Sequence, residues 1–163
     1  MYIYTIKKVI NALLDLPTYW RRSTHNRLIM TLLVKNEADI LEQNLLFHKH
    51  MGVDQFIITD NDSTDGTPQI IEKYVKKGWV AQYIHEPASG YEQKRWVDRM
   101  IWLAKKRYQA DWIINADADE FWFPSKGNLK TLLPSEHFGI LSAKVRNVCP
   151  EEGKPYWEWK NVA

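Results

Sequence analysis

The sequence predicts an α/β layered domain in which helices flank a mostly parallel central sheet. From residue 28 onward, short apolar runs rich in β-branched and aromatic residues alternate with segments whose apolar residues recur at helical spacing. The first four of these runs each end in a polar cluster. The chain has 163 residues, of which 45% are hydrophobic, so length and composition suit one domain with a substantial core.

Residues 1–27 are predicted to form a separate basic amphipathic segment before a domain of residues 28–163. Apolar residues recur at helical spacing from Ile6 to Leu14, so we expect a helix that ends before Pro17. The basic residues of the segment, set against one Asp, are Lys7, Lys8, Arg21, Arg22 and Arg27. Such a helix could lie on an anionic membrane surface or pack on the domain or on a partner, and both interpretations stay open.

The predicted elements of the domain follow in order. Strands are expected at 28–34 (LIMTLLV), 55–59 (QFIIT), 79–85 (WVAQYIH), 112–116 (WIINA) and 139–145 (GILSAKV), and the first two read as buried. The first helix should run from about Asp39 to Met51, with Ile40, Leu45 and Leu46 toward the core. The second helix should span 67–77 and end at Gly78, and the third should span 91–108.

The polar clusters at the strand ends indicate a site. They are Lys35-Asn36-Glu37, Asp60-Asn61-Asp62, His85-Glu86 and Asp117-Ala118-Asp119-Glu120. In parallel α/β sheets the ligand crevice lies beyond the carboxyl ends of the strands. Acidic residues follow all four strands, which the ordinary preference of Asp and Asn for turns does not explain. We therefore expect a binding site at this edge.

The stretch ITDNDSTDGT, residues 58–67, could be a calcium loop or part of a nucleotide site. An EF-hand alignment on Gly66 would use the ligands Asn61, Ser63, Asp65 and Glu72. The preceding residues read as a strand, whereas an EF-hand needs a helix there. The sequence therefore favours a strand that ends in an acidic turn, with Asp65 capping a helix that begins near Thr67-Pro68.

Asp117 and Asp119 form a D-x-D pair directly after a predicted strand. Extended backbone would place both side chains on one side with Ala118 facing away. Two close carboxylates repel each other unless a cation lies between them, and hard ions such as Mg²⁺ or Mn²⁺ prefer oxygen ligands. The pair therefore predicts a metal site, although a solvated acidic loop can also contain a D-x-D sequence.

The segments TLLVKNEADILEQNLLFHKHMGVDQFIITDNDSTDGT and ADWIINADADEFWFP together resemble the family-2-like glycosyltransferases of the GT-A fold, in particular a subgroup with a D-x-D-E-F element. The resemblance covers roughly residues 28–125 and implies a Rossmann-like GT-A layered domain that binds a nucleotide-sugar donor. Glu37 and the turn Asp60-Asn61-Asp62 would hold base and ribose, and Asp117 and Asp119 would hold metal and diphosphate. At the start of the third helix, one of Gln93, Lys94 and Arg95 is expected to contact base or phosphate.

The resemblance implies a glycosyltransferase dependent on Mn²⁺ or Mg²⁺, with a UDP-sugar as the expected donor and a glycan or lipid-linked acceptor, in surface polysaccharide or lipopolysaccharide synthesis. The general base of the family generally lies well downstream of the D-x-D. Glu120 is the candidate near the pair, and Glu151, Glu152 and Glu158 are the glutamates further downstream. The chain could therefore be a donor-binding half truncated at its C-terminus. The alternative is a noncatalytic nucleotide-sugar-binding or assembly module.

Charge and cysteine content limit the classes of partner and the cellular compartment that we expect. The 22 Lys and Arg residues nearly balance the 20 Asp and Glu residues, so no nucleic-acid partner is expected. The single Cys149 suits a reducing compartment. No apolar run approaches the length of about 20 residues that spans a bilayer, and no secretory signal is recognised. We expect a cytoplasmic location, with peripheral contact at the inner face of the membrane if the basic segment binds lipid.

Overall fold

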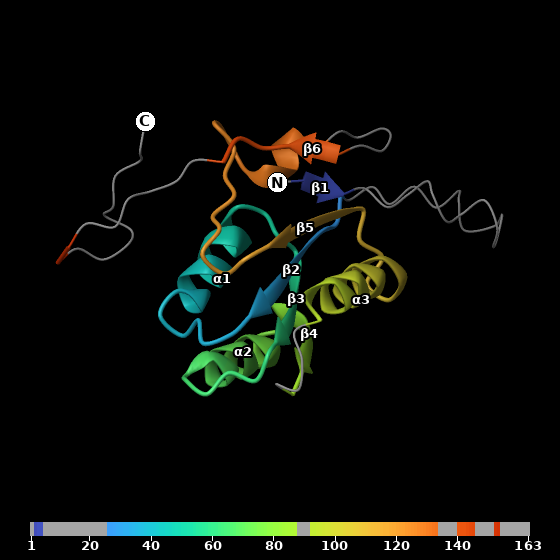
Figure 1. Ribbon diagram of the computed structural model, residues 1–163. Helices are drawn as coiled ribbons and strands as arrows, with labels where there is room; N and C mark the ends of the chain where they lie inside the picture. The colour runs from blue at the N-terminus through green and yellow to red at the C-terminus, as the bar shows by residue number, and fades with distance from the viewer. Residues whose placement is uncertain (1, 5–25, 88–91, 134–139, 146–151, 154–163) are drawn as a thin grey trace.

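The computed structural model describes residues 2–4, 26–87, 92–133, 140–145 and 152–153 (Figure 1). Its strands are β1 (Tyr2–Tyr4), β2 (Leu28–Val34), β3 (Gln55–Asp60), β4 (Val80–His85), β5 (Trp112–Ala116) and β6 (Ile140–Ser142). Its helices are α1 (Leu41–His50), α2 (Thr67–Lys76), α3 (Gln93–Lys106) and the short 3-10 helix η2 (Leu129–Leu132). None of the helices in these ranges has the length and apolar character needed to cross a bilayer.

The strands form one sheet in the order β4-β3-β2-β5-β1-β6, and its first four strands are parallel. Val34 of β2 pairs with Asp60 of β3, and Leu32 pairs with Ala116 of β5. The carboxyl ends of these strands therefore meet at one edge of the sheet. The predicted α/β domain with a Rossmann-like parallel core is confirmed.

The sheet continues beyond β5 through a strand that the sequence analysis did not predict. Tyr2–Tyr4 form β1, which pairs antiparallel with β5 on one side and with β6 on the other. Residues 2–4 therefore belong to the sheet of the domain, whereas the expected helix from Ile6 to Leu14 lies outside the described residues. The strand expected at 139–145 is shorter than predicted, because residues 143–145 are not extended in the sheet.

The core lies on both faces of the sheet because successive strand residues point to opposite sides. Met30 and Leu32 of β2 face α1 and α2, where they join the larger apolar cluster. Ile29 and its neighbours Ile57 and Ile113 face α3 and pack with the helix residues Met100 and Ala104. Each fully buried aliphatic side chain contributes about 1.5–3 kcal/mol relative to exposure.

Helix α1 buries a different set of residues from the predicted one. Leu41 and Leu45 are buried, but Leu46 is 46% exposed, so the prediction that it faces the core is wrong. Asn44 and His48 occupy buried positions on the same helix face instead. Spacing alone favoured the apolar Leu46, whereas the tertiary contacts of α1 select two polar residues.

Candidate functional site

A cavity of about 300 Å³ opens at the carboxyl ends of the parallel strands. Segments far apart in the sequence build it: the ends of β2, β3 and β5 and the first residue of α3. The lining residues are Leu33, Val34, Lys35, Glu37, Asn61, Gln93, Asp117, Ala118 and Asp119. The structure thus brings together residues from three of the four polar clusters predicted to converge.

The D-x-D pair lies on a tight turn and not on extended backbone. The Glu120 N–H donates to the Asp117 carbonyl at 3.1 Å, which closes a turn of four residues directly after β5. The expectation of extended backbone is therefore wrong, because the strand ends at Ala116. Asp117 and Asp119 are exposed and line the cavity together, and the buried Ala118 between them also contributes to its lining.

Glu120 does not line the cavity. Its carboxylate accepts a hydrogen bond from the Asp117 N–H at 3.2 Å, so the side chain folds back over the turn on which it lies. Burial raises the pKa of Glu120, and the charges of Asp117 and Asp119 raise it further, against the opposing effect of that hydrogen bond. In this conformation Glu120 supports the turn, and its role as a general base stays a prediction.

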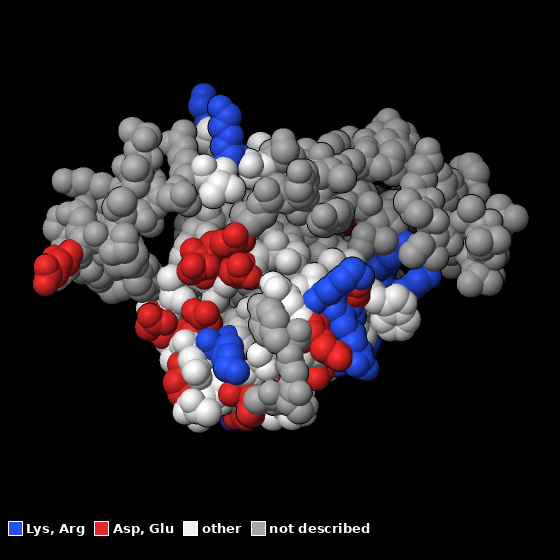
Figure 2. Space-filling view, viewed as in Figure 1, with Lys and Arg blue, Asp and Glu red and all other residues white. Residues whose placement is uncertain are grey.

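Carboxylates in the cavity repel each other. Although the residue is exposed overall, partial burial of its carboxyl group raises the pKa of Asp117, and the nearby charge of Asp119 raises it further. The pKa of Glu37 is raised in the same way, by burial first and then by the charge of Asp119. Figure 2 shows a group of acidic side chains on this face, and Lys and Arg side chains over α3 with acidic side chains among them.

These residues fit a hard divalent cation. Glu37, Asp117 and Asp119 offer oxygen atoms only, and a cation among them would relieve the repulsion that raises two of their pKa values. Within the described part of the chain, no three carboxylate, histidine or cysteine side chains converge closely enough to enclose a metal. A cation here would therefore need water or a ligand phosphate to complete its shell, as Mg²⁺ commonly does.

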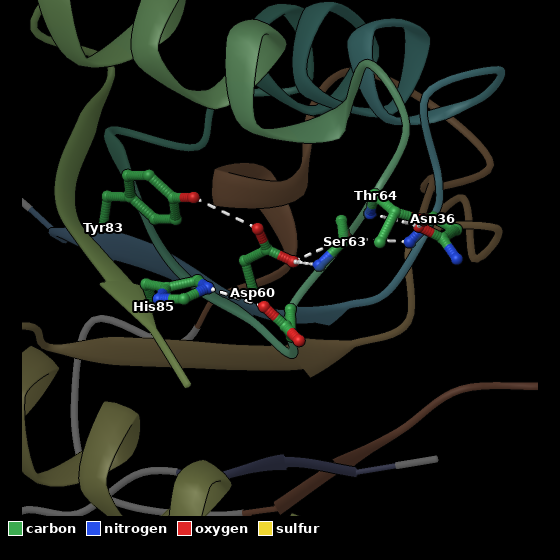
Figure 3. A network of polar contacts seen from close by, with 7 residues as sticks. Asn36, Asp60, Ser63, Thr64, Tyr83 and His85 are labelled. Atoms are coloured by element: carbon green, nitrogen blue, oxygen red, sulfur yellow. Dashed lines mark hydrogen bonds and ion pairs between the residues drawn. The ribbon is translucent and has the colours of Figure 1, made fainter. Parts of the chain in front are cut away.

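Asp60, predicted to contact the nucleoside, is fully buried and does not line the cavity. One carboxylate oxygen accepts hydrogen bonds from the N–H and the hydroxyl of Ser63, and the other accepts from the Tyr83 hydroxyl at 3.1 Å (Figure 3). Burial, together with the charge of Asp60, raises the pKa of Tyr83 to about 12. Asp60 therefore fastens the turn after β3 to β4.

The turn after β3 is also fastened to the loop after β2. Asn36 accepts the Thr64 N–H at 2.8 Å through its side-chain oxygen, and its own N–H donates to the Ser63 hydroxyl at 2.8 Å (Figure 3). Asp65 accepts the N–H of Thr67 at 2.9 Å and that of Ala38 at 3.1 Å. The N-cap of α2 is Gly66 and the helix has no side-chain cap bond, so Asp65 supports the first helical N–H from one residue upstream and is not the predicted cap. Because Ser63 and Asp65 bond to the protein and a strand precedes the turn, the calcium-loop alternative does not describe this segment.

Asn61 and Asp62, which follow Asp60 in this turn, differ in exposure. Asn61 lines the cavity, is 5% exposed, and its side-chain oxygen has no hydrogen-bond partner among the described residues. A buried acceptor without a partner costs about 1–3 kcal/mol, so this oxygen is placed to receive a donor from a ligand. Asp62 has a positive φ of 55° and lies on the exposed side, 3.2 Å from the Nε2 of His85.

Of the three candidates at the start of α3, Gln93 lines the cavity. Lys94 and Arg95 line a neighbouring open hollow and form exposed ion pairs with Asp98 and Glu92. The expectation that one of the three contacts base or phosphate stays a prediction, and Gln93 is the residue placed for it. Lys35 was not predicted as a site residue, although its place directly after a strand end was a signal that could have identified it.

Comparison with known proteins places these features in context. Residues 31–134 match the family described as Glycosyl transferase family 2. The chain is 24% identical over 147 residues to a glycosyltransferase family 92 protein of Oryza sativa subsp. japonica, which covers 85% of this chain and 24% of that protein. It is 34% identical over 66 residues to the lipopolysaccharide core biosynthesis glycosyltransferase LpsC of Rhizobium meliloti (strain 1021), which covers 40% of this chain and 22% of LpsC. The chain thus spans about a quarter of the length of these relatives.

Two solved structures are similar to part of the chain. A mannosyltransferase, PcManGT from Pyrobaculum calidifontis in complex with GDP-Man and Mn²⁺, aligns with a TM-score of 0.42 and 19% identity, over 62% of this chain and 30% of that chain. The S. aureus TarS 1-349 structure aligns with a TM-score of 0.44 and 21% identity, over 65% of this chain and 30% of that chain.

Proposed function

Because this chain belongs to glycosyl transferase family 2, we propose that it binds a nucleotide-sugar donor with a divalent cation and transfers the sugar to a glycan or lipid-linked acceptor. The observation that carries the proposal is the cavity itself. It combines Asn61, Gln93 and the carboxylates Asp117 and Asp119 at the edge of a parallel sheet. This is the edge at which α/β sheets bind nucleotides.

The lining residues divide by chemistry into two groups. The amides of Asn61 and Gln93 can both donate and accept hydrogen bonds, so they suit a nucleobase or a ribose. Asp117 and Asp119 would hold Mn²⁺ or Mg²⁺, with Glu37 adding negative charge to the same cavity. Lys35 brings positive charge to the cavity and would favour an anionic diphosphate.

A bound divalent cation would supply charge neutralisation for the diphosphate leaving group. The chain itself would provide the shape of the pocket and the orientation of the donor, because loops fastened to each other keep the lining residues in place. Asp60, Asn36 and Asp65 would act only in this supporting way, since their polar atoms bond to the protein.

Donor, acceptor and location belong to the proposal. A uridine nucleotide is the donor base that the family resemblance favours, and the relation to a lipopolysaccharide core enzyme supports a surface-glycan acceptor. We place the site on the cytoplasmic side, where nucleotide sugars are made. Basic residues in the segment 1–27 would give peripheral contact with an anionic membrane.

The test is metal-dependent stabilisation by nucleotides. Melting temperature would be measured with UDP, GDP and their sugar derivatives, each with Mn²⁺, with Mg²⁺ and with a chelator. A ligand that binds only the native state raises stability in proportion to the logarithm of its concentration over Kd. One nucleotide should stabilise the chain with metal and much less with chelator; equal effects in both conditions would contradict the metal role.

A second function, noncatalytic binding of a nucleotide sugar, is favoured by a different observation. Glu120 is bonded to its own turn, and Glu152, the described glutamate further downstream, is exposed and does not line the cavity. Turnover separates the two functions. A catalyst should hydrolyse its donor slowly in the presence of metal, whereas a binding module should bind the same donor and leave it intact.

A further inference from the structure

Helix α1 buries two polar residues, Asn44 and His48, one turn apart on its core face. Both side chains are completely inaccessible to solvent. Burying polar groups is favourable only when each finds a partner, and apolar residues of similar size would pack there without that requirement. The reason for a polar pair must therefore lie in what the two side chains contact.

Both residues bind the backbone of the loop that carries the D-x-D pair. The Asn44 side-chain amide donates to the carbonyl of Ala118 at 2.8 Å and to that of Glu120 at 3.0 Å. The Nε2 of His48 accepts the N–H of Trp122 at 2.9 Å. Three alternate residues of one loop are thus held by two side chains of one helix.

Asn44 and His48 are also hydrogen-bonded to each other, and the bonds of the His48 ring define which of its nitrogens carries the proton. The Trp122 N–H can only donate, so Nε2 of His48 carries no proton and Nδ1 carries one. That Nδ1–H points at the side-chain oxygen of Asn44 at 2.9 Å and at the Asn44 carbonyl at 3.0 Å. Burial lowers the pKa of His48 to about 4, so the ring is neutral near pH 7. This bond turns the Asn44 amide so that its nitrogen faces the loop.

Aromatic packing closes the other side of the contact. The Phe121 ring stacks on His48 with centroids 5.9 Å apart and meets Phe47 edge to face at 5.3 Å. The imidazole is therefore held by hydrogen bonds at both nitrogens and by a ring on one face. Such a contact has one favourable geometry, so it specifies the position of the loop as well as stabilising it.

We propose that Asn44 and His48 are positioning residues that hold the turn at 117–120 so that Asp117 and Asp119 face the cavity. They lie outside the cavity lining and act through the loop backbone. The inference rests on the proposed function, because it assigns the pair a role in binding a metal and a nucleotide. It predicts that loosening the contact weakens that binding more than an equal loss of core packing elsewhere.

The experiment uses four variants of the full chain. His48→Phe keeps an aromatic ring, although a larger one, and removes the acceptor, whereas His48→Gln restores an acceptor oxygen. Asn44→Ser can replace at most one of the two bonds donated by Asn44, and it carries the same test if His48→Phe fails to fold. Ile71→Val, on α2 in the same apolar cluster as Ala118 and Trp122, is the control that loses packing but removes no hydrogen bond to the loop.

Two quantities are measured for each variant. The first is the hydrogen-exchange rate of the Trp122 amide in the protein without ligand. The second is the affinity for Mn²⁺ with UDP and with GDP, from water-proton relaxation. Loss of one buried hydrogen bond corresponds to about a tenfold change, so His48→Phe and Asn44→Ser should exchange faster and bind more weakly by about tenfold. His48→Gln and Ile71→Val should stay close to the parent.

The outcomes separate the two proposals. If the parent binds Mn²⁺ with a nucleotide and the variants at Asn44 and His48 match it, the positioning role is overturned while the proposed function stands. Equal weakening in Ile71→Val would also overturn the positioning role, since general destabilisation would then explain the loss. If the parent binds neither nucleotide with Mn²⁺, the proposed function fails, and the positioning role fails with it.

Discussion

Asp60 and Asn61 are adjacent acidic-turn residues for which the structure predicts opposite effects of substitution. The Asp60 carboxylate is fully buried and accepts from Ser63 at one oxygen and from Tyr83 at the other. The side-chain oxygen of Asn61 is buried at the cavity without a partner. Substitution at the first position should therefore affect stability, and substitution at the second should affect ligand binding.

The magnitudes follow from these contacts. Asp60→Asn keeps an oxygen for Ser63 and a contact with the Tyr83 hydroxyl but loses the charge, so we expect the free energy of unfolding to fall by about 1–2 kcal/mol. Asn61→Ala removes an unpaired acceptor, a gain of about 1–3 kcal/mol that lost packing at the cavity would partly offset. Its stability should therefore equal or exceed that of the parent, while its affinity for Mn²⁺ with UDP or GDP should fall about tenfold.

Urea denaturation measures the first quantity, and nucleotide titration well below the unfolding midpoint measures the second. An independent check is the phenol of Tyr83, because burial and then the charge of Asp60 raise its pKa to about 12, and Asp60→Asn removes that charge. The ultraviolet titration of Asp60→Asn should show one tyrosine ionising at lower pH than in the parent. If Asp60→Asn keeps full stability and loses nucleotide affinity as Asn61→Ala does, the roles assigned to these two residues are wrong.

Asp117→Asn and Asp119→Asn should each weaken metal-dependent nucleotide binding sharply. The melting temperature without ligand should hold or rise, because each substitution removes charge from a site where carboxylates repel each other. A variant that melts well below the parent yet binds metal and nucleotide normally would refute the metal role. The neutral His48 should make stability fall between pH 6.5 and 4, since the unfolded state takes up a proton there and the native state, with a pKa of about 4, does not. The fall should reach about 3 kcal/mol in the parent and be absent in His48→Gln, as urea denaturation at several pH values would show. Membrane binding by the segment 1–27 should be tested by charge removal, because deletion would also remove β1. Sedimentation with anionic vesicles at low salt should be lost, and nucleotide binding kept, when Gln replaces the basic residues Lys7, Lys8, Arg21 and Arg22; a parent chain that ignores such vesicles would refute the surface role.

The sequence alone determined the parallel part of the fold and the edge at which the site lies. Strands β2, β3, β4 and β5 occupy the runs that predicted them, because short runs rich in β-branched and aromatic residues favour extended backbone locally. This holds also for the edge strand β4, most of whose residues are only partly buried. The D-x-D pair follows β5, as its place after such a run indicated. The start of α2 at Thr67-Pro68 was also predictable, since proline suits the first helical turn, but its N-cap is Gly66 and not the predicted Asp65.

Only the tertiary structure decided which polar residues line the cavity and which support it. Asp60 and Asn61 carry similar side chains, yet one bonds to Tyr83 of the neighbouring strand and the other faces the cavity. Likewise Gln93 faces the cavity while Lys94 does not, because the direction of each side chain depends on how α3 is rotated against the sheet.

The remaining differences have the same cause. A run of three residues, Tyr2–Tyr4, carries too little pattern to predict β1, which exists because β5 and β6 pair with it from either side. Asn44 and His48 lie on the core face of α1, where local periodicity favoured the apolar Leu46, because their partners are backbone groups of a loop more than 70 residues away. Local sequence encodes backbone conformation through steric and apolar pattern, whereas the partner of a polar side chain is set by contacts between distant segments, which form only when the sheet and its helices assemble.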